Sequence, residues 1–249
     1  MSKAKYRFSI LSLIVLFILI WHFGVVLFHV PNYIIPAPLT LIDYMVNFFR
    51  TGDLTPHILV TLKEVFVGTF FGILLGMVLG YLIAKVEVFD KLITPILLIM
   101  QISPKISIAP LFILWFGLGL ESKVALVILV VSFPIMLNES TAIKNVDTSY
   151  RDFLSIMNAN KWQVFYYLEL PSALREVISG IKVAVTQAIT SAVIGEMMGA
   201  KQGLGYLLTN GSELYDINMI LTAIIILSFI GVVLYYFFDW LEGKLLYWE

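Results

Sequence analysis

Residues 147–180 read DTSYRDFLSIMNANKWQVFYYLELPSALREVISG, the longest part of the chain without an apolar run of membrane-spanning length. Runs of that length flank it on both sides. Apolar residues recur in it at roughly helical spacing, with polar residues between them: Phe153, Leu154, Met157 and Phe165. The pattern predicts an amphipathic helix that Pro171 ends, because proline lacks the N–H that the next helical turn needs. A helix with an apolar side between two spans is typical of a segment that contacts a soluble partner.

The composition indicates an integral membrane protein. The chain has 249 residues, of which 60% are hydrophobic and 13% charged, and its mean hydropathy is +0.94. A soluble domain of this length could not cover so much apolar surface. The net charge of −1 gives no basic surface for nucleic acid. The chain has no cysteine, which excludes thiol catalysis, disulfides and thiolate metal sites.

The apolar runs predict an all-α, polytopic protein with about six transmembrane helices in a single domain, residues 1–249. We expect a first helix within residues 1–30 and a permease-like core at residues 57–245. The six expected spans are residues 8–30, 57–84, 92–117, 124–142, 177–199 and 218–238. Prolines and polar residues between Gln101 and Pro110 break the third run, and such breaks persist only where protein or water satisfies the freed backbone groups.

Four glycines recur every fourth residue in the second run: Gly68, Gly72, Gly76 and Gly80. Small residues at this spacing lie on one helix face and let another helix approach closely. We favour packing within the subunit over a dimer seam or a lining of the transport pathway.

The distribution of Lys and Arg predicts the orientation, because cytoplasmic loops of membrane proteins carry an excess of both. With the N-terminus inside, eleven of them fall in the cytoplasm: Lys3, Lys5, Arg7, Lys85, Lys91, Lys144, Arg151, Lys161, Arg175, Lys182 and Lys244. Four fall outside, Arg50, Lys63, Lys123 and Lys201, and Lys105 is unplaced. We therefore expect both termini and the loop 144–176 in the cytoplasm of a bacterial cell.

The loop resembles the cytoplasmic loop of permease subunits of binding-protein-dependent ABC importers. Their signature is Glu-Ala-Ala, three residues, Gly, nine residues, then Ile-x-Leu-Pro. At this spacing Asp152-Phe153-Leu154 takes the Glu-Ala-Ala place, Asn158 the Gly place and Leu168 the Ile place, before Leu170-Pro171. Asn suits the Gly position if that position needs a left-handed backbone. The resemblance implies that this stretch couples to an ATPase through Asp152, Phe153, Leu154, Met157, Asn158, Ala159, Leu170 and Pro171.

Further motifs extend the resemblance over residues 55–245. The stretches IAPLFILWFGLG (108–119), GEMMGA (195–200) and GLGY (203–206) resemble the nitrate, sulfonate and taurine branch, which also includes importers of thiamine-pyrimidine precursors. This implies a type I importer permease: a homodimer, two copies of an ATP-binding subunit and an extracytoplasmic solute-binding protein. ATP and magnesium would be used by the partner ATPase, and this chain would bind no cofactor.

The chain shows no catalytic or metal-binding motif. G-x-x-x-x-G-K-[ST] is absent, and His22, His29 and His57 are scattered outside any H-E-x-x-H pattern. Ionisable groups within spans are costly and usually face a cavity or a partner. We therefore select Lys105 and Glu196, together with a polar stripe of Gln187, Thr190 and Ser191, as candidates for the translocation pathway.

Each pathway candidate has a structural alternative. Lys105 is compatible with a side chain that extends from the helix break toward the membrane surface. Glu196 is compatible with a structural pair, because on a straight helix it lies about half a turn from Gln187. Of these two positions we choose the Gln187 face for the pathway. Asn138 and Glu139 are interpreted as marking the water boundary of the fourth span.

An ATP-driven importer permease is favoured over an ATP-independent secondary transporter or channel, which would favour paired intramembrane charges and symmetry between the halves. A membrane enzyme would need a nucleophile or an acid–base pair in one place, and the sequence presents no such cluster. The expected cargo is a small solute, such as a sulfonate, nitrate, taurine or a pyrimidine-type vitamin precursor.

Overall fold

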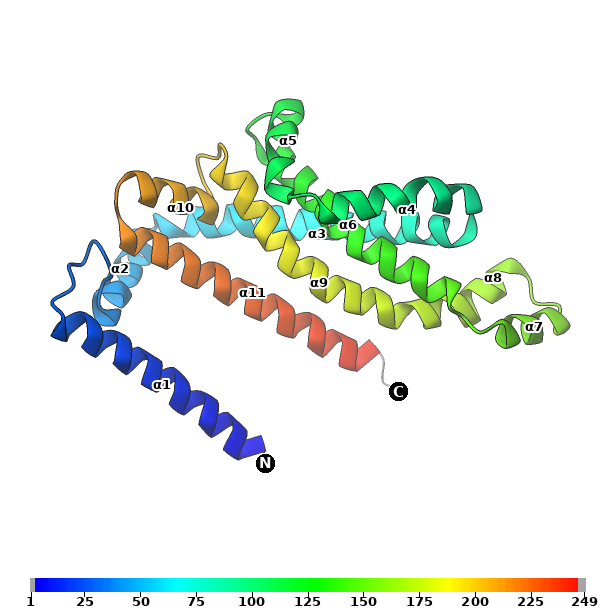
Figure 1. Cartoon of the computed structure of the whole chain (residues 1–249), viewed down its shortest axis with the longest axis horizontal. Helices are drawn as coiled ribbons and strands as arrows, with labels where there is room; N and C mark the ends of the chain where they lie inside the picture. The colour runs from blue at the N-terminus through cyan, green and yellow to red at the C-terminus, as the bar shows by residue number, and fades with distance from the viewer. Residues whose placement is uncertain (1–2, 246–249) are drawn as a thin grey trace.

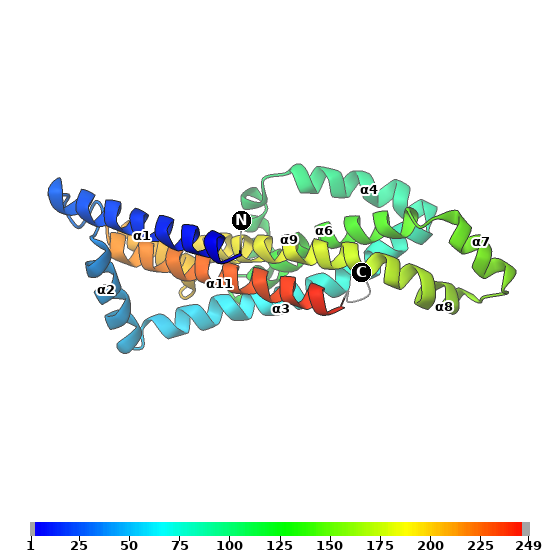
Figure 2. The same ribbon diagram turned by 90° about the horizontal axis from the view of Figure 1, so that it is seen from below.

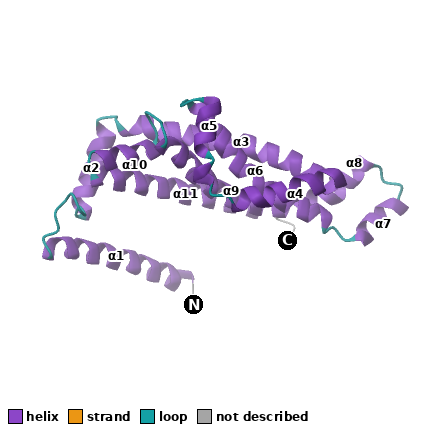
Figure 3. Cartoon of the chain, turned by 45° about the horizontal axis from the view of Figure 1, so that its top comes forward, coloured by secondary structure: helices purple, strands orange, loops and turns teal. Residues whose placement is uncertain are grey.

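The structure, a computed structural model, describes the backbone of residues 3–245 and their side chains except at residues 3–8, 10, 11, 101, 102 and 105. Within this range it consists of helices and connecting loops, without strands (Figures 1 and 3). The elements are α1 (Lys3–Leu27), α2 (Pro38–Arg50), α3 (Leu54–Lys85), α4 (Glu87–Ile102), η1 (Lys105–Ser107), α5 (Ala109–Phe116), α6 (Leu120–Lys144), α7 (Thr148–Ile156), α8 (Lys161–Val164), η2 (Phe165–Glu169), α9 (Leu170–Met197), α10 (Leu204–Glu213) and α11 (Ile217–Leu245).

Four helical stretches are long and apolar enough to cross a membrane: α3, α6, the continuous segment Lys161–Met197 and α11. A shorter apolar stretch, Ser12–Leu27, lies in α1. The third expected span is not one helix: α4 ends at Ile102, η1 makes one short turn, and α5 begins at Ala109. The break predicted from the prolines and polar residues between Gln101 and Pro110 is therefore present.

The prediction that Pro171 ends the preceding helix is wrong. Proline is tolerated in the first turn of a helix, where its missing N–H needs no partner, and Pro171 lies in the first turn of α9. The turn before it, η2, is a π-helix, in which the Leu170 N–H bonds to the Phe165 carbonyl. α8 and η2 therefore lead directly into α9.

The core of the fold lies between α3, α6 and α9. The glycine face of α3 packs against α6: a Cβ added to Gly72 would lie 2.7 Å from Val131 Cγ1, and one added to Gly76 would lie 2.8 Å from Ile135 Cβ. Val131 and Ile135 are fully buried. The glycine repeat therefore packs within the subunit, because its missing side chains let two spans come into contact.

The molecule is elongated, and the two ends of its bundle differ (Figures 1 and 2). α7 and α8 project beyond the bundle at one end, whereas α2 and α10 lie at the other. α1 stands apart from the long helices and reaches them through α2 (Figures 1 and 3). The segment formed by α7 and α8 therefore lies at the tip of the molecule, away from α10.

Candidate coupling site

The tip of the molecule begins with α7, whose start is fixed by Asp147. The Asp147 carboxylate accepts hydrogen bonds from both the backbone N–H and the hydroxyl of Ser149, each at 2.8 Å. Bonds to the charged form favour it, so they hold the pKa of the Asp147 carboxyl below its usual value. The carboxylate thus satisfies one of the backbone donors that the first turn of a helix leaves unpaired, the Ser149 N–H.

The chain reverses after α7 at Asn158, which has φ +55°, in the left-handed region. Asparagine tolerates this region better than most residues. The Ala159 N–H donates to the Leu154 carbonyl at 3.0 Å, closing the turn. Asn160 then begins α8 with a capping box, in which Asn160 and Gln163 each bond the other's backbone N–H at 2.9 and 2.7 Å. The expected single helix is therefore two short helices joined by a defined turn.

The outer side of α7 and its turn is apolar and exposed. Ile156 is 81% exposed, Met157 64% and Phe153 59%, and we call these three residues the docking surface. Leu154, expected to share the apolar stripe, is half-buried. Apolar surface left in water costs roughly 25 cal/mol per Å², which favours a covering partner.

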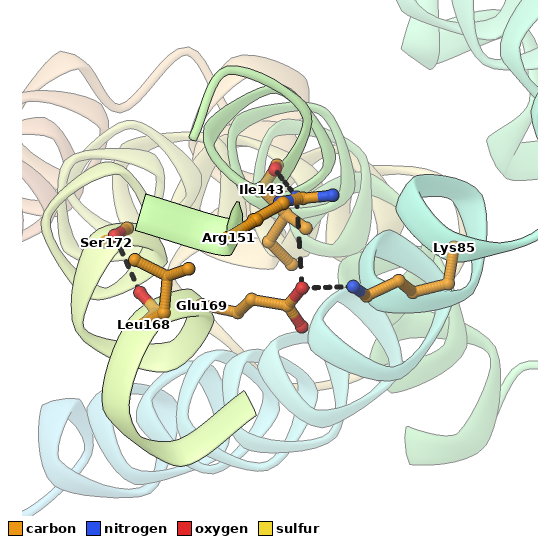
Figure 4. A network of polar contacts seen from close by, with 6 residues as sticks. All are labelled: Lys85, Ile143, Arg151, Leu168, Glu169 and Ser172. Atoms are coloured by element: carbon orange, nitrogen blue, oxygen red, sulfur yellow. Dashed lines mark hydrogen bonds and ion pairs between the residues drawn. The ribbon is translucent and has the colours of Figure 1, made fainter. Parts of the chain in front are cut away.

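A buried carboxylate connects this tip to the bundle. Glu169, in η2, is 1% exposed and ion-paired with Lys85, in the last turn of α3 (Figure 4). Arg151 of α7 approaches the same carboxylate, with its Nη2 3.8 Å from Glu169 Oε1. The Arg151 guanidinium also donates to the Ile143 carbonyl, near the end of α6, at 2.7 Å.

The Glu169 network therefore joins four segments at one point: the ends of α3 and α6, the middle of α7, and the start of α9. Next to it the Ser172 hydroxyl donates to the Leu168 carbonyl at 2.6 Å, within the turns on either side of Pro171. A buried ion pair holds its geometry tightly, because separating one partner leaves an unpaired charge. Arg151 and Glu169 thus place α7 in contact with the ends of α3 and α9.

Residues 72–247 match the family model for the binding-protein-dependent transport system inner membrane component. The chain belongs to this family. Its relatives are ABC transporter permeases, so it is a multi-pass membrane permease for small solutes.

Two curated relatives cover most of the chain. A probable ABC transporter permease protein of Haemophilus influenzae is 31% identical over 230 residues, which are 92% of this chain and 93% of the relative. The formylaminopyrimidine transport permease protein ThiX of Halalkalibacterium halodurans is 33% identical over 217 residues, covering 87% and 86%. The resemblance stated from the sequence is thereby confirmed.

The fold of the permease is also found in solved transporters. A chain of the MetNI methionine ABC transporter in an inward-facing conformation superposes with a TM-score of 0.64 at 21% identity, covering 77% of this chain and 94% of that one. A chain of an amino acid ABC transporter has a TM-score of 0.60 at 16% identity, covering 83% and 96%. The all-α importer-permease fold is therefore confirmed.

The residues of the polar stripe expected on α9 differ in exposure. Thr190 is exposed, Gln187 is half-buried, and Ser191 is buried with its hydroxyl donating to the Gln187 carbonyl at 2.8 Å. Lys105 begins η1, and its side chain lies outside the described residues.

Glu196 lies in a buried polar cluster near the outer end of α9. Its carboxylate accepts from the Thr61 hydroxyl at 2.6 Å and from the Gly205 N–H at 2.5 Å. Glu64 and Lys123 lie beside it and are also buried. These contacts favour the structural alternative for Glu196, because both of its oxygens bond to neighbouring elements.

Together, side chains of α3 and α9 hold the start of α10. The N–H groups of Gly203, Leu204 and Gly205 donate in turn to His57 Nδ1 at 3.0 Å, Thr61 Oγ1 at 2.8 Å and Glu196 Oε2 at 2.5 Å. These donors have no partner within the helix itself. His57 therefore has a structural role here, and its ring also stacks on Tyr206 with the centroids 5.6 Å apart.

Four buried charged residues were not selected from the sequence as site residues: Glu64, Lys123, Glu139 and Glu169. Glu139, which the sequence places near the inner end of the fourth span, is 6% exposed. Lys123 was counted among the external charges, but its ammonium is buried and donates to the carbonyls of Leu118 and Gly119. Glu169 was visible at the x position of the Ile-x-Leu-Pro signature, and its adjacency to Leu170-Pro171 was the available signal.

Proposed function

We propose that this permease is driven by an ATP-binding subunit that covers the docking surface of α7, and that it imports a small solute delivered by an extracytoplasmic solute-binding protein. ATP and magnesium are used by that subunit. Two permease copies and two ATP-binding subunits form the complete transporter, by analogy with the family signature. The observation that carries the proposal is the exposed apolar tip, fastened to three spans through Glu169.

The supporting reasoning is mechanical. An apolar surface at the end of a membrane bundle needs a partner, and the turn beneath it is held by its own hydrogen bonds. Because Arg151 links α7 to Glu169, closure of the partner displaces α9 and α3 rather than a loose connection. A permease that lacks a nucleotide-binding motif can only obtain the energy of ATP in this way.

The test uses two substitutions, each with a matched control. Met157→Asp places a charge on the docking surface, and Met157→Leu keeps it apolar. Asn158→Val puts a β-branched residue into the left-handed position, whereas Asn158→Gly keeps that conformation accessible. Co-purification of the ATP-binding subunit and solute-stimulated ATP turnover in liposomes are measured.

We expect permeases with Met157→Asp or Asn158→Val to insert into the membrane normally, but their solute-stimulated ATP turnover should fall at least tenfold. The turnover of both control variants should stay within about twofold of wild type. If both Met157→Asp and Asn158→Val co-purify with the ATP-binding subunit and show normal solute-stimulated turnover, this turn is only a connecting loop.

A separate experiment addresses the solute and the residues that line its pathway. The name of the relative ThiX refers to formylaminopyrimidine, and the names of other relatives refer to riboflavin, aliphatic sulfonates and taurine. We therefore propose a small organic solute. Gln187, Thr190 and Lys105 are retained as pathway candidates. If the solute is an anion, Lys105→Ala should reduce uptake more than Lys105→Arg, and full uptake of a proven anion by Lys105→Ala would remove it from the pathway.

A further inference from the structure

A cavity of about 450 Å³ lies beside the coupling site, between α3, α6 and the α8–η2 segment. Its walls are mostly apolar and aromatic: Met77, Val78, Tyr81, Leu82, Trp162 and Phe165. Two charged residues complete the lining, Glu139 from α6 and Lys161 from α8. A space of this size accommodates a small organic molecule.

Glu139 distinguishes this cavity from an ordinary apolar gap. Its side chain is 6% exposed, and its Oε2 atom has no hydrogen-bond partner among the described residues. A buried ionised carboxylate without a partner is costly, so such a group holds a proton unless a cation pairs with it. The other buried carboxylate at this end, Glu169, has Lys85 as its partner, whereas no described ion pair reaches Glu139.

The backbone of α3 is shaped around this carboxylate. A Cβ added to Gly80 would lie 2.6 Å from Glu139 Oε2, so the glycine leaves the space that the carboxylate occupies. The carboxylate is therefore held against α3 by packing, at the wall of the cavity and without a counter-charge.

The surrounding groups determine the charge of a suitable ligand. Lys161 is exposed, so water and salt screen its ammonium. Glu139 is buried, where electrostatic interactions are stronger than in water. The Lys85 ammonium lies 5.8 Å from the centroid of the Tyr81 ring, so Trp162 is the ring that offers a face to an organic cation. A buried carboxylate beside aromatic rings suits a protonated amine.

We propose that this cavity binds a small aromatic molecule bearing one protonated amine, with the ammonium paired to Glu139 and the ring packed against Trp162 and Phe165. The site is separate from the docking surface. It touches α3, α6 and the segment that leads into α9, so an occupant would connect the coupling site to two spans.

The test titrates full-length permease in lipid nanodiscs with 1-naphthylmethylamine, by calorimetry, with the heat from empty nanodiscs subtracted. The neutral isostere 1-naphthalenemethanol is the matched ligand control. Glu139→Gln removes the charge with little change of shape, and Glu87→Gln makes the same change on an exposed carboxylate. Trp162→Ala removes one aromatic wall.

We expect saturable binding of the amine to wild type and to Glu87→Gln, with affinity at least tenfold lower in Glu139→Gln and several-fold lower in Trp162→Ala. The alcohol should bind wild type at least tenfold more weakly than the amine. Equal affinities for amine and alcohol, undiminished binding by Glu139→Gln, or no saturable binding of the amine would each overturn the proposal. If Glu139→Gln does not fold, the comparison of amine and alcohol on wild type decides. The outcome is independent of whether α7 docks an ATPase.

Discussion

The carboxylate of Glu169 is ion-paired with the ammonium of Lys85, and this contact fastens the segment that follows the α7 turn to the last turn of α3. Glu169 is fully buried, whereas Lys85 is about one-third exposed. The pair thus gives the coupling site a fixed point within the bundle, and its removal should affect stability and energy transfer together.

The first prediction concerns this pair. Glu169→Leu leaves Lys85 and Arg151 without their shared acceptor, and we expect it to destabilise the permease by about 3–5 kcal/mol, the usual cost of breaking a buried pair. Combining it with Lys85→Met should cost less than the sum of the single changes. Thermal unfolding in detergent measures both, and strictly additive losses would contradict an energetic link between the two residues.

The second prediction concerns orientation. Ser149 lies in α7 and Asn210 in α10, at opposite ends of the molecule (Figure 1). Because the chain has no cysteine, a single cysteine at either position can be labelled selectively. We expect an impermeant maleimide to label Asn210→Cys in intact cells, and Ser149→Cys only after permeabilisation. Labelling of both from one side would exclude the proposed topology.

The third prediction concerns the packing of α3 on α6. Gly72→Ala would place a Cβ 2.7 Å from Val131 Cγ1 and 3.1 Å from the Ile128 carbonyl oxygen. Overpacking of this kind costs about 1–3 kcal/mol, so the unfolding temperature should fall. Gly24→Ala in α1 is the matched control, since a Cβ there meets nothing within 4 Å. Equal unfolding temperatures of the Gly72→Ala and Gly24→Ala variants would show that α3 and α6 separate easily to admit the extra methyl group.

The fourth prediction concerns the start of α10. The two oxygens of Glu196 accept from Thr61 and from the Gly205 N–H, and a glutamine has only one oxygen to offer. We expect Glu196→Gln to speed hydrogen exchange at the amides of residues 204–207 several-fold. Glu213→Gln, an exposed change in the same helix, should leave these amides unaffected. Unchanged protection in Glu196→Gln would remove the carboxylate as the anchor of α10.

Much of the fold could be predicted because membrane spans are recorded in local composition. The long apolar runs locate α3, α6, α9 and α11, and the position of Asn158 in the signature anticipates its left-handed backbone. The break after Met157 could not be predicted, because it depends on the capping box of Asn160 rather than on apolar spacing. The prediction that Pro171 ends a helix is wrong for a similar reason, since the π-helical turn before it leaves no clear periodic pattern in the sequence.

The candidate site was only partly visible for a different reason. The helical spacing predicts Phe153 and Met157 of the docking surface, whereas Ile156, the most exposed of the three, is not among the predicted residues. The charged contacts of the site join residues far apart in sequence: Lys85 with Glu169, and Thr61 with Glu196. A sequence shows which charges exist but not which of them are buried together, and the same applies to Glu139 and Gly80.

The two carboxylates near the ends of α9 have a joint consequence. Glu169 is ion-paired with Lys85 in the last turn of α3, and Glu196 accepts a hydrogen bond from Thr61 near the start of α3. The same two helices are therefore joined near both of their ends. Along α9 these two contacts are roughly 40 Å apart, at 1.5 Å of rise per residue. Two helices held together near both ends resist sliding past each other and separating. We therefore expect a displacement at the α7 end to move α3 and α9 together.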